Sequence, residues 1–270
     1  MSIHLLAIDL DGTLLSSQKV ISDATESAIR DARERAGVHV VLASARPPRT
    51  VMPFYRLLEL DAPMINYNGA LVYDPPSDRI LMHRPLPLKT SLRIVTMARQ
   101  MFPDVLVSAE ILDRWYTDRL DEQYLTETAR LVRPDAVAPL SQWLTRAVTK
   151  LMLMGPPEML TALVNAISKE YLHQVSMVQT EIDLLQIMHA TVSKAQALRV
   201  IAGEMGVTRE QVMAIGDNAN DVGMLNWAGF SVAVANAVPD AMAVADLVTD
   251  SNDQDGVANA IKQVIFDGKR

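Results

Sequence analysis

The chain has no cysteine, which excludes disulfide bonds, zinc–thiolate sites and cysteine nucleophiles. Aromatic residues make up only 5% of its 270 residues, and no apolar stretch in the sequence is long enough to span a bilayer. It also has no excess of basic residues, because the formal net charge is -7. This charge argues against a nucleic-acid-binding face, although an acidic protein can still hold a small cationic site for an anionic substrate.

The remaining composition is that of a folded protein. Hydrophobic residues make up 49% of the chain and charged residues 21%, as is typical of globular domains. The first apolar run, residues 5–8, is short and is followed by Asp9 and Asp11, so it does not resemble a signal peptide. We therefore expect a cytoplasmic protein that associates with no membrane and no nucleic acid.

Short apolar runs alternate with helical patterns at both ends of the chain. In the N-terminal part, buried strands are predicted at residues 5–8, 38–43 and 64–67, and helices at 22–36 and 49–58. Asn68-Gly69 signals a turn, and residues 70–73 and 79–83 favour a hairpin. In the C-terminal part, strands are predicted at 212–215 and 231–234, and helices at 194–205, 221–227, 239–245 and 256–266. The strand–helix–strand order implies right-handed crossovers and a parallel sheet.

The middle of the chain has a different pattern. Two of the three tryptophans, Trp115 and Trp143, lie there, and a strand at 148–154 precedes a helix at 158–170. We interpret residues 84–188 as an α+β domain inserted into an α/β domain. The predicted α/β domain is therefore discontinuous and consists of residues 1–83 and 189–270.

Polar residues follow three of the predicted strands. Asp9 and Asp11 follow the first strand, Ser44 follows the second, and the segment from Asp217 to Asp221 follows the strand at 212–215. Ligands of open parallel sheets bind at the carboxyl ends of the strands. If these strands are neighbours, the four carboxylates Asp9, Asp11, Asp217 and Asp221 converge on one point.

Such a group of carboxylates repels itself unless a cation neutralises it. Magnesium is the usual cation beside a phosphate, because it prefers oxygen ligands and keeps several waters. Ser44 and Lys194 are residue types that hold phosphate oxygens. Each residue also has a structural alternative: Asp11-Gly12 as a turn, Ser44 as a helix cap and Lys194 as a surface lysine. The joint occurrence of these residues after buried strands favours the functional interpretation.

Four segments together resemble a known family. Asp9-Leu10-Asp11-Gly12-Thr13-Leu14 resembles the first motif of the haloacid dehalogenase-like phosphatase superfamily. Ala43-Ser44-Ala45-Arg46-Pro47 resembles its second motif, Ser193-Lys194 its third, and Gly216-Asp217-Asn218-Ala219-Asn220-Asp221 its fourth. Asn68-Gly69-Ala70 and Asp255-Gly256-Val257-Ala258 are also similar to the Cof-type sugar phosphatases of subfamily IIB. The second motif usually reads Thr-Gly-Arg, and Ser44 keeps the hydroxyl.

The resemblance implies a fold and a reaction. The fold is a Rossmann-like parallel-sheet core with an inserted α+β cap of the C2 type, which closes over the substrate and selects the leaving group. Asp9 is the implied nucleophile, and Asp11 the implied general acid and then base. Magnesium would be held by Asp9, the backbone carbonyl of Asp11 and Asp217, with Asp221 close behind. The implied phosphate-binding groups are Ser44, Lys194, Asn220 and the backbone amides of Leu10 and Ala45.

Several activities agree with these motifs. The favoured one is magnesium-dependent hydrolysis of small phosphorylated metabolites, in particular sugar phosphates, through an aspartyl-phosphate. A phosphomutase and a specialised sucrose-phosphate or mannosyl-phosphoglycerate phosphatase remain as alternatives, as does a non-catalytic protein that binds phosphorylated metabolites. A dehalogenase of the same superfamily lacks the second aspartate, so Asp11 argues against that activity. The sequence gives no indication of the oligomeric state.

Overall fold

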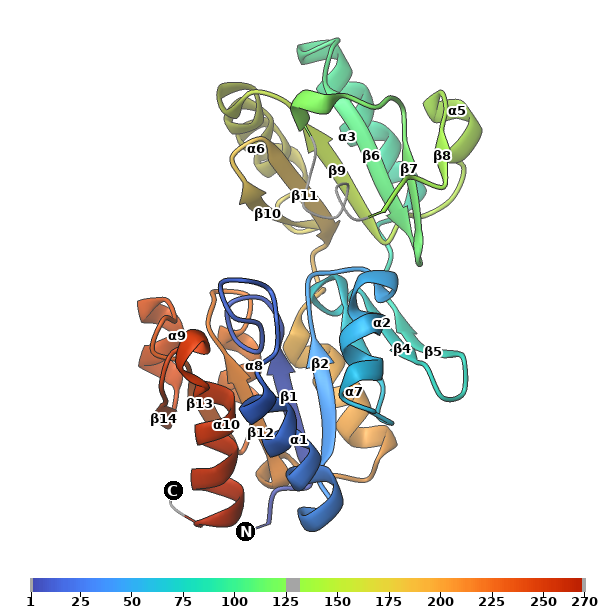
Figure 1. Cartoon of the computed structure of the whole chain (residues 1–270). Coiled ribbons are helices and arrows are strands. Elements are labelled where there is room, and N and C mark those ends of the chain that lie inside the picture. Colours follow the sequence, from blue (N-terminus) through green and yellow to red (C-terminus); the bar gives the residue numbers. More distant parts are fainter. Residues whose placement is uncertain (1, 125–131, 269–270) are drawn as a thin grey trace. The chain divides into compact units, whose positions relative to one another are not determined.

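The computed structural model describes residues 2–124 and 132–268, and it divides into two compact units (Figure 1). Unit 1 consists of Met1–Met82 and Ser193–Arg270, and unit 2 of His83–Val192. The boundaries that we predicted, after residues 83 and 188, lie within four residues of these divisions. The described part of the chain contains no helix with the length and apolar character that a membrane span requires.

Unit 1 is built on an eight-stranded sheet in the order β14-β13-β12-β1-β2-β3-β4-β5. Neighbouring strands are parallel from β14 to β3, and β4 is antiparallel to β3. The predicted α/β class with a parallel sheet is thus confirmed. The strands are β1 (Leu5–Asp9), β2 (His39–Ala43), β3 (Met64–Asn66), β4 (Leu71–Asp74), β5 (Arg79–His83), β12 (Val212–Gly216), β13 (Phe230–Ala233) and β14 (Leu247–Val248).

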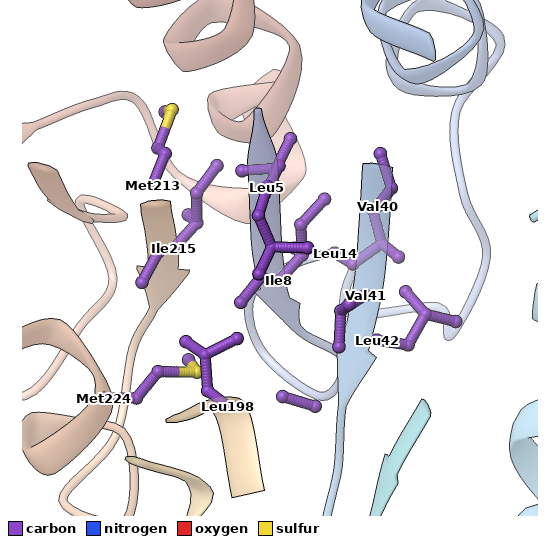
Figure 2. Packing of buried hydrophobic residues seen from close by; sticks show 14 of the residues in the cluster. Leu5, Ile8, Leu14, Val40, Val41, Leu42, Leu198, Met213, Ile215 and Met224 are labelled. Atoms are coloured by element: carbon purple, nitrogen blue, oxygen red, sulfur yellow. The ribbon is translucent and has the colours of Figure 1, made fainter. Parts of the chain in front are cut away.

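The central strand β1 is buried along its whole length. Figure 2 shows Leu5 and Ile8 between the side chains of β2 and those of β12. A strand covered on both faces needs apolar residues at successive positions, and this explains the uninterrupted run Leu5-Leu6-Ala7-Ile8. Burial of this run holds the sheet together through the hydrophobic effect.

The helices of unit 1 agree with the predicted ones to within a few residues. Helix α1 begins after Ser22, whose hydroxyl accepts a hydrogen bond from the Thr25 amide at 3.1 Å. The last predicted helix is shorter than expected, because the α-helix ends at Ile261 and Lys262–Phe266 forms a π-helical turn. The helices are α1 (Asp23–Ala36), α2 (Pro48–Leu57), α7 (Lys194–Glu204), α8 (Val222–Trp227), α9 (Pro239–Val244) and α10 (Gly256–Ile261), with 3₁₀ turns at Tyr67–Gly69, Arg209–Gln211 and Asn252–Gln254.

Unit 2 contains a six-stranded sheet in the order β10-β11-β9-β6-β7-β8. It is antiparallel except for β7 and β8, which are parallel. Residues of α3 and α6, such as Ile94 and Leu163, form a second hydrophobic core with the sheet. The elements are α3 (Leu88–Met101), β6 (Leu106–Ile111), β7 (Arg114–Thr117), a 3₁₀ turn (Glu122–Tyr124), β8 (Ala136–Val137), α5 (Leu140–Trp143), β9 (Lys150–Met154), α6 (Pro157–Tyr171), β10 (Val175–Glu181) and β11 (Leu184–His189).

The register of unit 1 aligns the ends of three strands. Asp9 at the end of β1 lies opposite Ala43 at the end of β2, and Ile8 lies opposite Ile215 of β12. The residues that follow these strands therefore meet at one edge of the sheet.

Replacing a buried isoleucine of this sheet should be far more destabilising than replacing an exposed one. Ile215 on β12 is 0% exposed, and Ile80 on the edge strand β5 is 47% exposed. We expect Ile215→Ala to lower the free energy of unfolding by about 2–5 kcal/mol, because it leaves a cavity. The control Ile80→Ala should lower it by less than about 1 kcal/mol. Urea denaturation of both variants measures the difference, and equal losses would contradict this assignment of the core.

Candidate active site

The loop after β1 passes close to the loop after β12. The hydroxyl of Thr13 donates a hydrogen bond to Asp217 Oδ1 at 2.9 Å. Gly12 has a φ of +85°, and a Cβ atom at this position would lie 2.5 Å from Asp217 Oδ2. Only glycine allows this approach, so the Asp-Gly pair is part of the site as well as a turn.

The loop after β12 is held together by hydrogen bonds to the side chain of Asp221. One oxygen of its carboxylate, Oδ2, accepts hydrogen bonds from the backbone amides of Asp217 at 3.1 Å and Asn218 at 3.0 Å. Asp221 is 0% exposed and directly precedes α8. These hydrogen bonds connect the Asp221 side chain to the loop before it, and the side chain makes no capping bond to α8.

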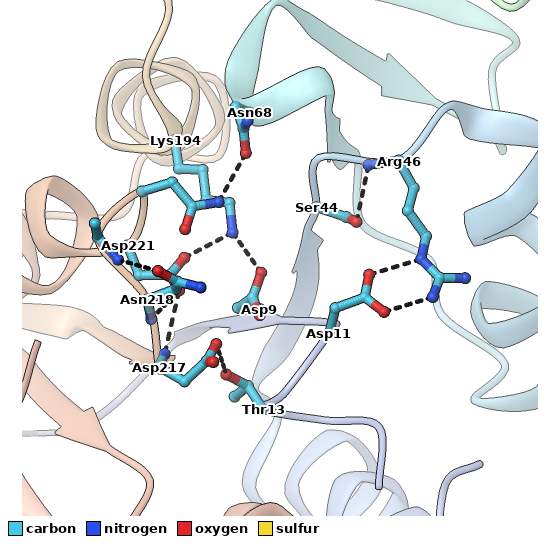
Figure 3. A network of polar contacts seen from close by, with 12 residues as sticks. Asp9, Asp11, Thr13, Ser44, Arg46, Asn68, Lys194, Asp217, Asn218 and Asp221 are labelled. Carbon is cyan, nitrogen blue, oxygen red and sulfur yellow. Dashed lines mark hydrogen bonds and ion pairs between the residues drawn. The ribbon is translucent and has the colours of Figure 1, made fainter. Parts of the chain in front are cut away.

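Lys194 is the cation of the site. It is the first residue of α7, where the hydroxyl of Ser193 caps the helix by accepting from the Gln196 amide at 3.2 Å. The ammonium group donates to Asp9 Oδ1 and, at 2.6 Å, to Asp221 Oδ1 (Figure 3). Because Lys194 is only 1% exposed, the alternative of a surface lysine is wrong.

Asp9, Asp217 and Asp221 each place a carboxylate oxygen within 4.8 Å of the others. Burial and the charge of Asp221 raise the pKa of Asp9 well above its ordinary value, and burial also raises the pKa of Asp217. Burial works against the charge of Lys194, but Asp221 and Asp9 outweigh it and raise the lysine pKa. The raised pKa values of the two carboxyl groups and of the lysine have one cause: a single ammonium group is shared by two carboxylates, and a third carboxylate lies beside them.

The side chain of Asp11 lies apart from these three carboxylates. Arg46 donates to it from Nε at 2.7 Å and from Nη2 at 2.5 Å (Figure 3). Lys19 also donates to it, at 2.9 Å. Burial alone would raise the pKa of Asp11, but the hydrogen bonds from Arg46 and Lys19 lower it below its ordinary value. The expectation that four carboxylates converge is therefore wrong for this side chain, which two cations draw away. A metal contact through the backbone carbonyl of Asp11 stays a prediction.

Ser44 follows β2 and is not a helix cap. Its hydroxyl accepts a hydrogen bond from the Arg46 amide at 3.1 Å, whereas Pro47 occupies the cap position of α2. Ala45 lies between these partners, and Leu10 follows β1 with its side chain in the core. Phosphate binding by the Ser44 hydroxyl and by the amides of Leu10 and Ala45 stays a prediction.

Asn220 has a partner that the sequence pattern did not indicate. Its Nδ2 donates to Asn68 Oδ1 at 2.9 Å, and Asn68 belongs to the turn between β3 and β4. Thr13 and Arg46 were not predicted as site residues, although Thr13 belongs to the first motif and Arg46 to the second. Lys19 lies eight residues after its partner Asp11 in a loop, where no periodic pattern points to it.

The C-terminal part of the chain holds the loop after β1 in place. Asn236 donates from Nδ2 to the carbonyl of Gly12 at 2.8 Å and accepts at Oδ1 from the Asn252 amide at 2.9 Å. Asn252 donates in turn to the carbonyl of Leu15 at 2.8 Å. These bonds fix the path of the backbone on which Asp11 and Thr13 stand.

The three clustered carboxylates suit a hard divalent cation. Their donor atoms are all oxygen, and the nearest positive charge, Lys194, balances only one of the three negative charges. Magnesium prefers oxygen ligands of this kind. Asp221 already accepts from Lys194 and from two amides, so Asp9 and Asp217 are the better candidates for direct ligands.

Comparison with known proteins gives consistent matches over the whole chain. The family model of the haloacid dehalogenase-like hydrolases matches residues 6–261. The 5-amino-6-(5-phospho-D-ribitylamino)uracil phosphatase YitU of Bacillus subtilis is 30% identical over 96% of this chain and 97% of its own length. Phosphatase YwpJ of the same organism is 29% identical over 97% of this chain and 99% of its own. The crystal structure of a haloacid dehalogenase-like hydrolase from Bacteroides thetaiotaomicron has a TM-score of 0.89 and 27% identity, and the match covers 97% of this chain and 100% of that one.

The raised pKa of Asp9 predicts a pH-dependent stability in the absence of metal. A carboxyl group whose pKa is higher in the folded state stabilises the fold below its unfolded pKa, and this stabilisation is lost as pH rises through the folded pKa. Asp9→Asn cannot ionise, so its stability relative to the natural protein should increase as the pH rises above the ordinary pKa of an aspartate. Denaturation in the presence of a chelator measures this, with the exposed Asp240→Asn as control. Parallel pH profiles for the natural protein and Asp9→Asn would contradict the expected pKa.

Proposed function

The chain belongs to the haloacid dehalogenase-like hydrolases, and from this membership and the site geometry we propose that it is a magnesium-dependent phosphatase acting through an aspartyl-phosphate at Asp9. One observation carries the proposal. The carboxylate of Asp9 is buried at the edge of the parallel sheet, beside Asp217 and Asp221, and Lys194 is the cation in contact with it. Asp11, two residues further, is held by Arg46 and Lys19 instead of by Lys194.

The first proposed step transfers the phosphoryl group to the protein. An oxygen of Asp9 attacks the phosphorus atom, the bond from phosphorus to the leaving oxygen breaks, and Asp11 gives that oxygen a proton. The ammonium group of Lys194, the Ser44 hydroxyl, Asn220 and the amides of Leu10 and Ala45 would stabilise the negative charge on the transferring group.

The second proposed step releases inorganic phosphate. Asp11, now a carboxylate, takes a proton from a water molecule whose oxygen attacks the phosphorus atom, and the bond to Asp9 breaks. The contacts of Asp11 with Arg46 and Lys19 favour this carboxylate form. Donation of a proton in the first step therefore requires that Asp11 leave Arg46 before or during substrate binding.

Magnesium is part of the proposal, with Asp9, Asp217 and the backbone carbonyl of Asp11 as its ligands. A bound magnesium ion would offset the charge of the carboxylates and of the incoming phosphate. Asp221 would stand behind these ligands, where it holds Lys194 and the amides of the Asp217 loop. Asp9 would then be oriented by one contact with Lys194 and one with the metal.

The proposed substrates are small phosphorylated metabolites, in particular sugar phosphates. The motifs resemble those of the Cof-type sugar phosphatases, and YitU acts on a phosphorylated ribityl chain. Both observations favour a polyhydroxylated phosphate ester. The cytoplasmic location expected from the sequence stays a prediction.

The natural protein should hydrolyse p-nitrophenyl phosphate with magnesium and lose this activity in a chelator. Asp9→Asn should lower kcat by at least about a thousandfold, because the first covalent step needs this carboxylate. Circular dichroism provides the control that the variant is folded. Turnover by pure Asp9→Asn would overturn the assignment of the nucleophile, and no turnover by the natural protein would favour a binding protein.

Asp11→Asn should accumulate the phosphorylated form of the protein. p-Nitrophenolate leaves without needing a proton, so the first step can proceed, while the second step lacks its base. Mass spectrometry should then find one added phosphoryl group on the peptide that contains Asp9. A phosphorylated peptide elsewhere, or none at any time after mixing, would count against this two-step mechanism. Transfer of the group to a second sugar phosphate in the natural protein would instead support a phosphomutase.

A further inference from the structure

The turn between β3 and β4 has an unusual backbone. Three successive residues have positive φ values: 51° at Tyr67, 56° at Asn68 and 98° at Gly69. Glycine adopts such values freely and asparagine tolerates them, but a bulky residue such as tyrosine does so at a cost in free energy. Strained conformations persist where surrounding contacts fix them, and they are concentrated at functional sites.

The contacts of this turn reach two of the segments that carry the proposed chemistry. The amide of Asn68 donates to the Ser44 carbonyl at 3.0 Å, and the amide of Tyr67 donates to the Arg46 carbonyl at 3.3 Å. On its other side, Gly69 packs against the start of α7, where an added Cβ would lie 2.3 Å from the Ser193 carbonyl oxygen. The turn therefore lies between the segment that follows β2 and the residue that precedes Lys194.

The side chain of Asn68 reaches the third segment. It is only 6% exposed, and its Oδ1 accepts the hydrogen bond from Asn220 Nδ2 at 2.9 Å. Figure 3 shows the Asn68 side chain directed toward the group formed by Lys194, Asp9 and Asp221. The left-handed backbone is what directs this carboxamide into the site while its amide stays on Ser44.

We infer that Asn68 is a positioning residue of the phosphate site, which holds the Asn220 side chain and the Ser44 backbone in the arrangement that receives a phosphate group. This inference rests on the proposed function, in which Ser44 and Asn220 contact the phosphate. A carboxamide fixed before binding loses less conformational freedom when the ligand arrives, so binding is tighter. Asn68 acts through Asn220 and has no part in bond formation.

The test is Asn68→Gly. Glycine adopts a φ of 56° without strain, so this substitution removes the side chain and leaves the turn intact. We expect KM and the inhibition constant of inorganic phosphate to rise about fivefold, as for the loss of one hydrogen bond, with a smaller change in kcat. Titration calorimetry with inorganic phosphate and magnesium measures the same loss of affinity independently of turnover.

A double-mutant cycle tests whether Asn68 acts through Asn220. Asn220→Ala should weaken phosphate binding at least as much as Asn68→Gly. The double variant should be no weaker than Asn220→Ala alone, because the bond between the two side chains is already lost. Additive losses would overturn the inference.

Asp78→Gly is the matched control. Asp78 also has a positive φ, 52°, and its side chain also accepts one hydrogen bond, from the Tyr73 hydroxyl at 2.8 Å, but it lies in the turn between β4 and β5. This variant should keep the KM and phosphate affinity of the natural protein. Thermal unfolding of both glycine variants shows whether either has lost its fold.

The outcomes separate the inference from the proposed function. If the natural protein neither hydrolyses p-nitrophenyl phosphate nor binds inorganic phosphate, the proposed function fails. If the natural protein is active and Asn68→Gly keeps its KM and phosphate affinity, the inference fails and the proposed function stands. A loss of thermal stability in Asn68→Gly with unchanged KM would likewise assign the residue a purely structural role.

Discussion

The buried ammonium group of Lys194 is the interaction on which the site depends. It bonds to Asp9 at the end of β1 and to Asp221 after β12, and so joins three segments that are distant in sequence. Removing one partner of a buried ion pair generally costs about 3–5 kcal/mol, because the other charge stays buried. A single lysine leaves part of the carboxylate charge unbalanced, and this imbalance is what makes the site receptive to a further cation.

Much of this arrangement could be predicted from the sequence because its determinants are local. Buried strands have uninterrupted apolar runs, and Asp9, Ser44 and Asp217 were found because they directly follow such runs. The direction of the Asp11 side chain could not be predicted in this way. It depends on Arg46 and Lys19, and on a backbone path that Asn236 and Asn252 fix from the other end of the chain.

Unit 2 was harder to predict for a related reason. Strand β6 is buried at every position, yet it carries the polar residues Ser108 and Glu110, which are 0% and 2% exposed. Polar residues inside a buried strand interrupt the apolar pattern from which strands are inferred. The hydroxyl of Ser108, for example, donates to the Tyr116 carbonyl and accepts from Trp115 Nε1, both on β7, and such pairing is not visible along the sequence. The same holds for the turn at Asn68. The dipeptide Asn68-Gly69 predicts the turn, but it does not predict which residues the turn contacts.

The sheet of unit 1 is formed by two separate parts of the sequence, and this has a consequence for biosynthesis. Leu5 of β1 pairs with Val212 of β12, about two hundred residues later, and unit 2 lies entirely between them. As the chain leaves the ribosome, unit 2 is complete before β12 has been translated, and domains generally fold as units. Strand β1 must wait for its neighbour β12, and Asp9 meets Lys194 and Asp217 only after unit 2 has been translated. Formation of the carboxylate cluster is thus tied to translation of the segment that follows unit 2.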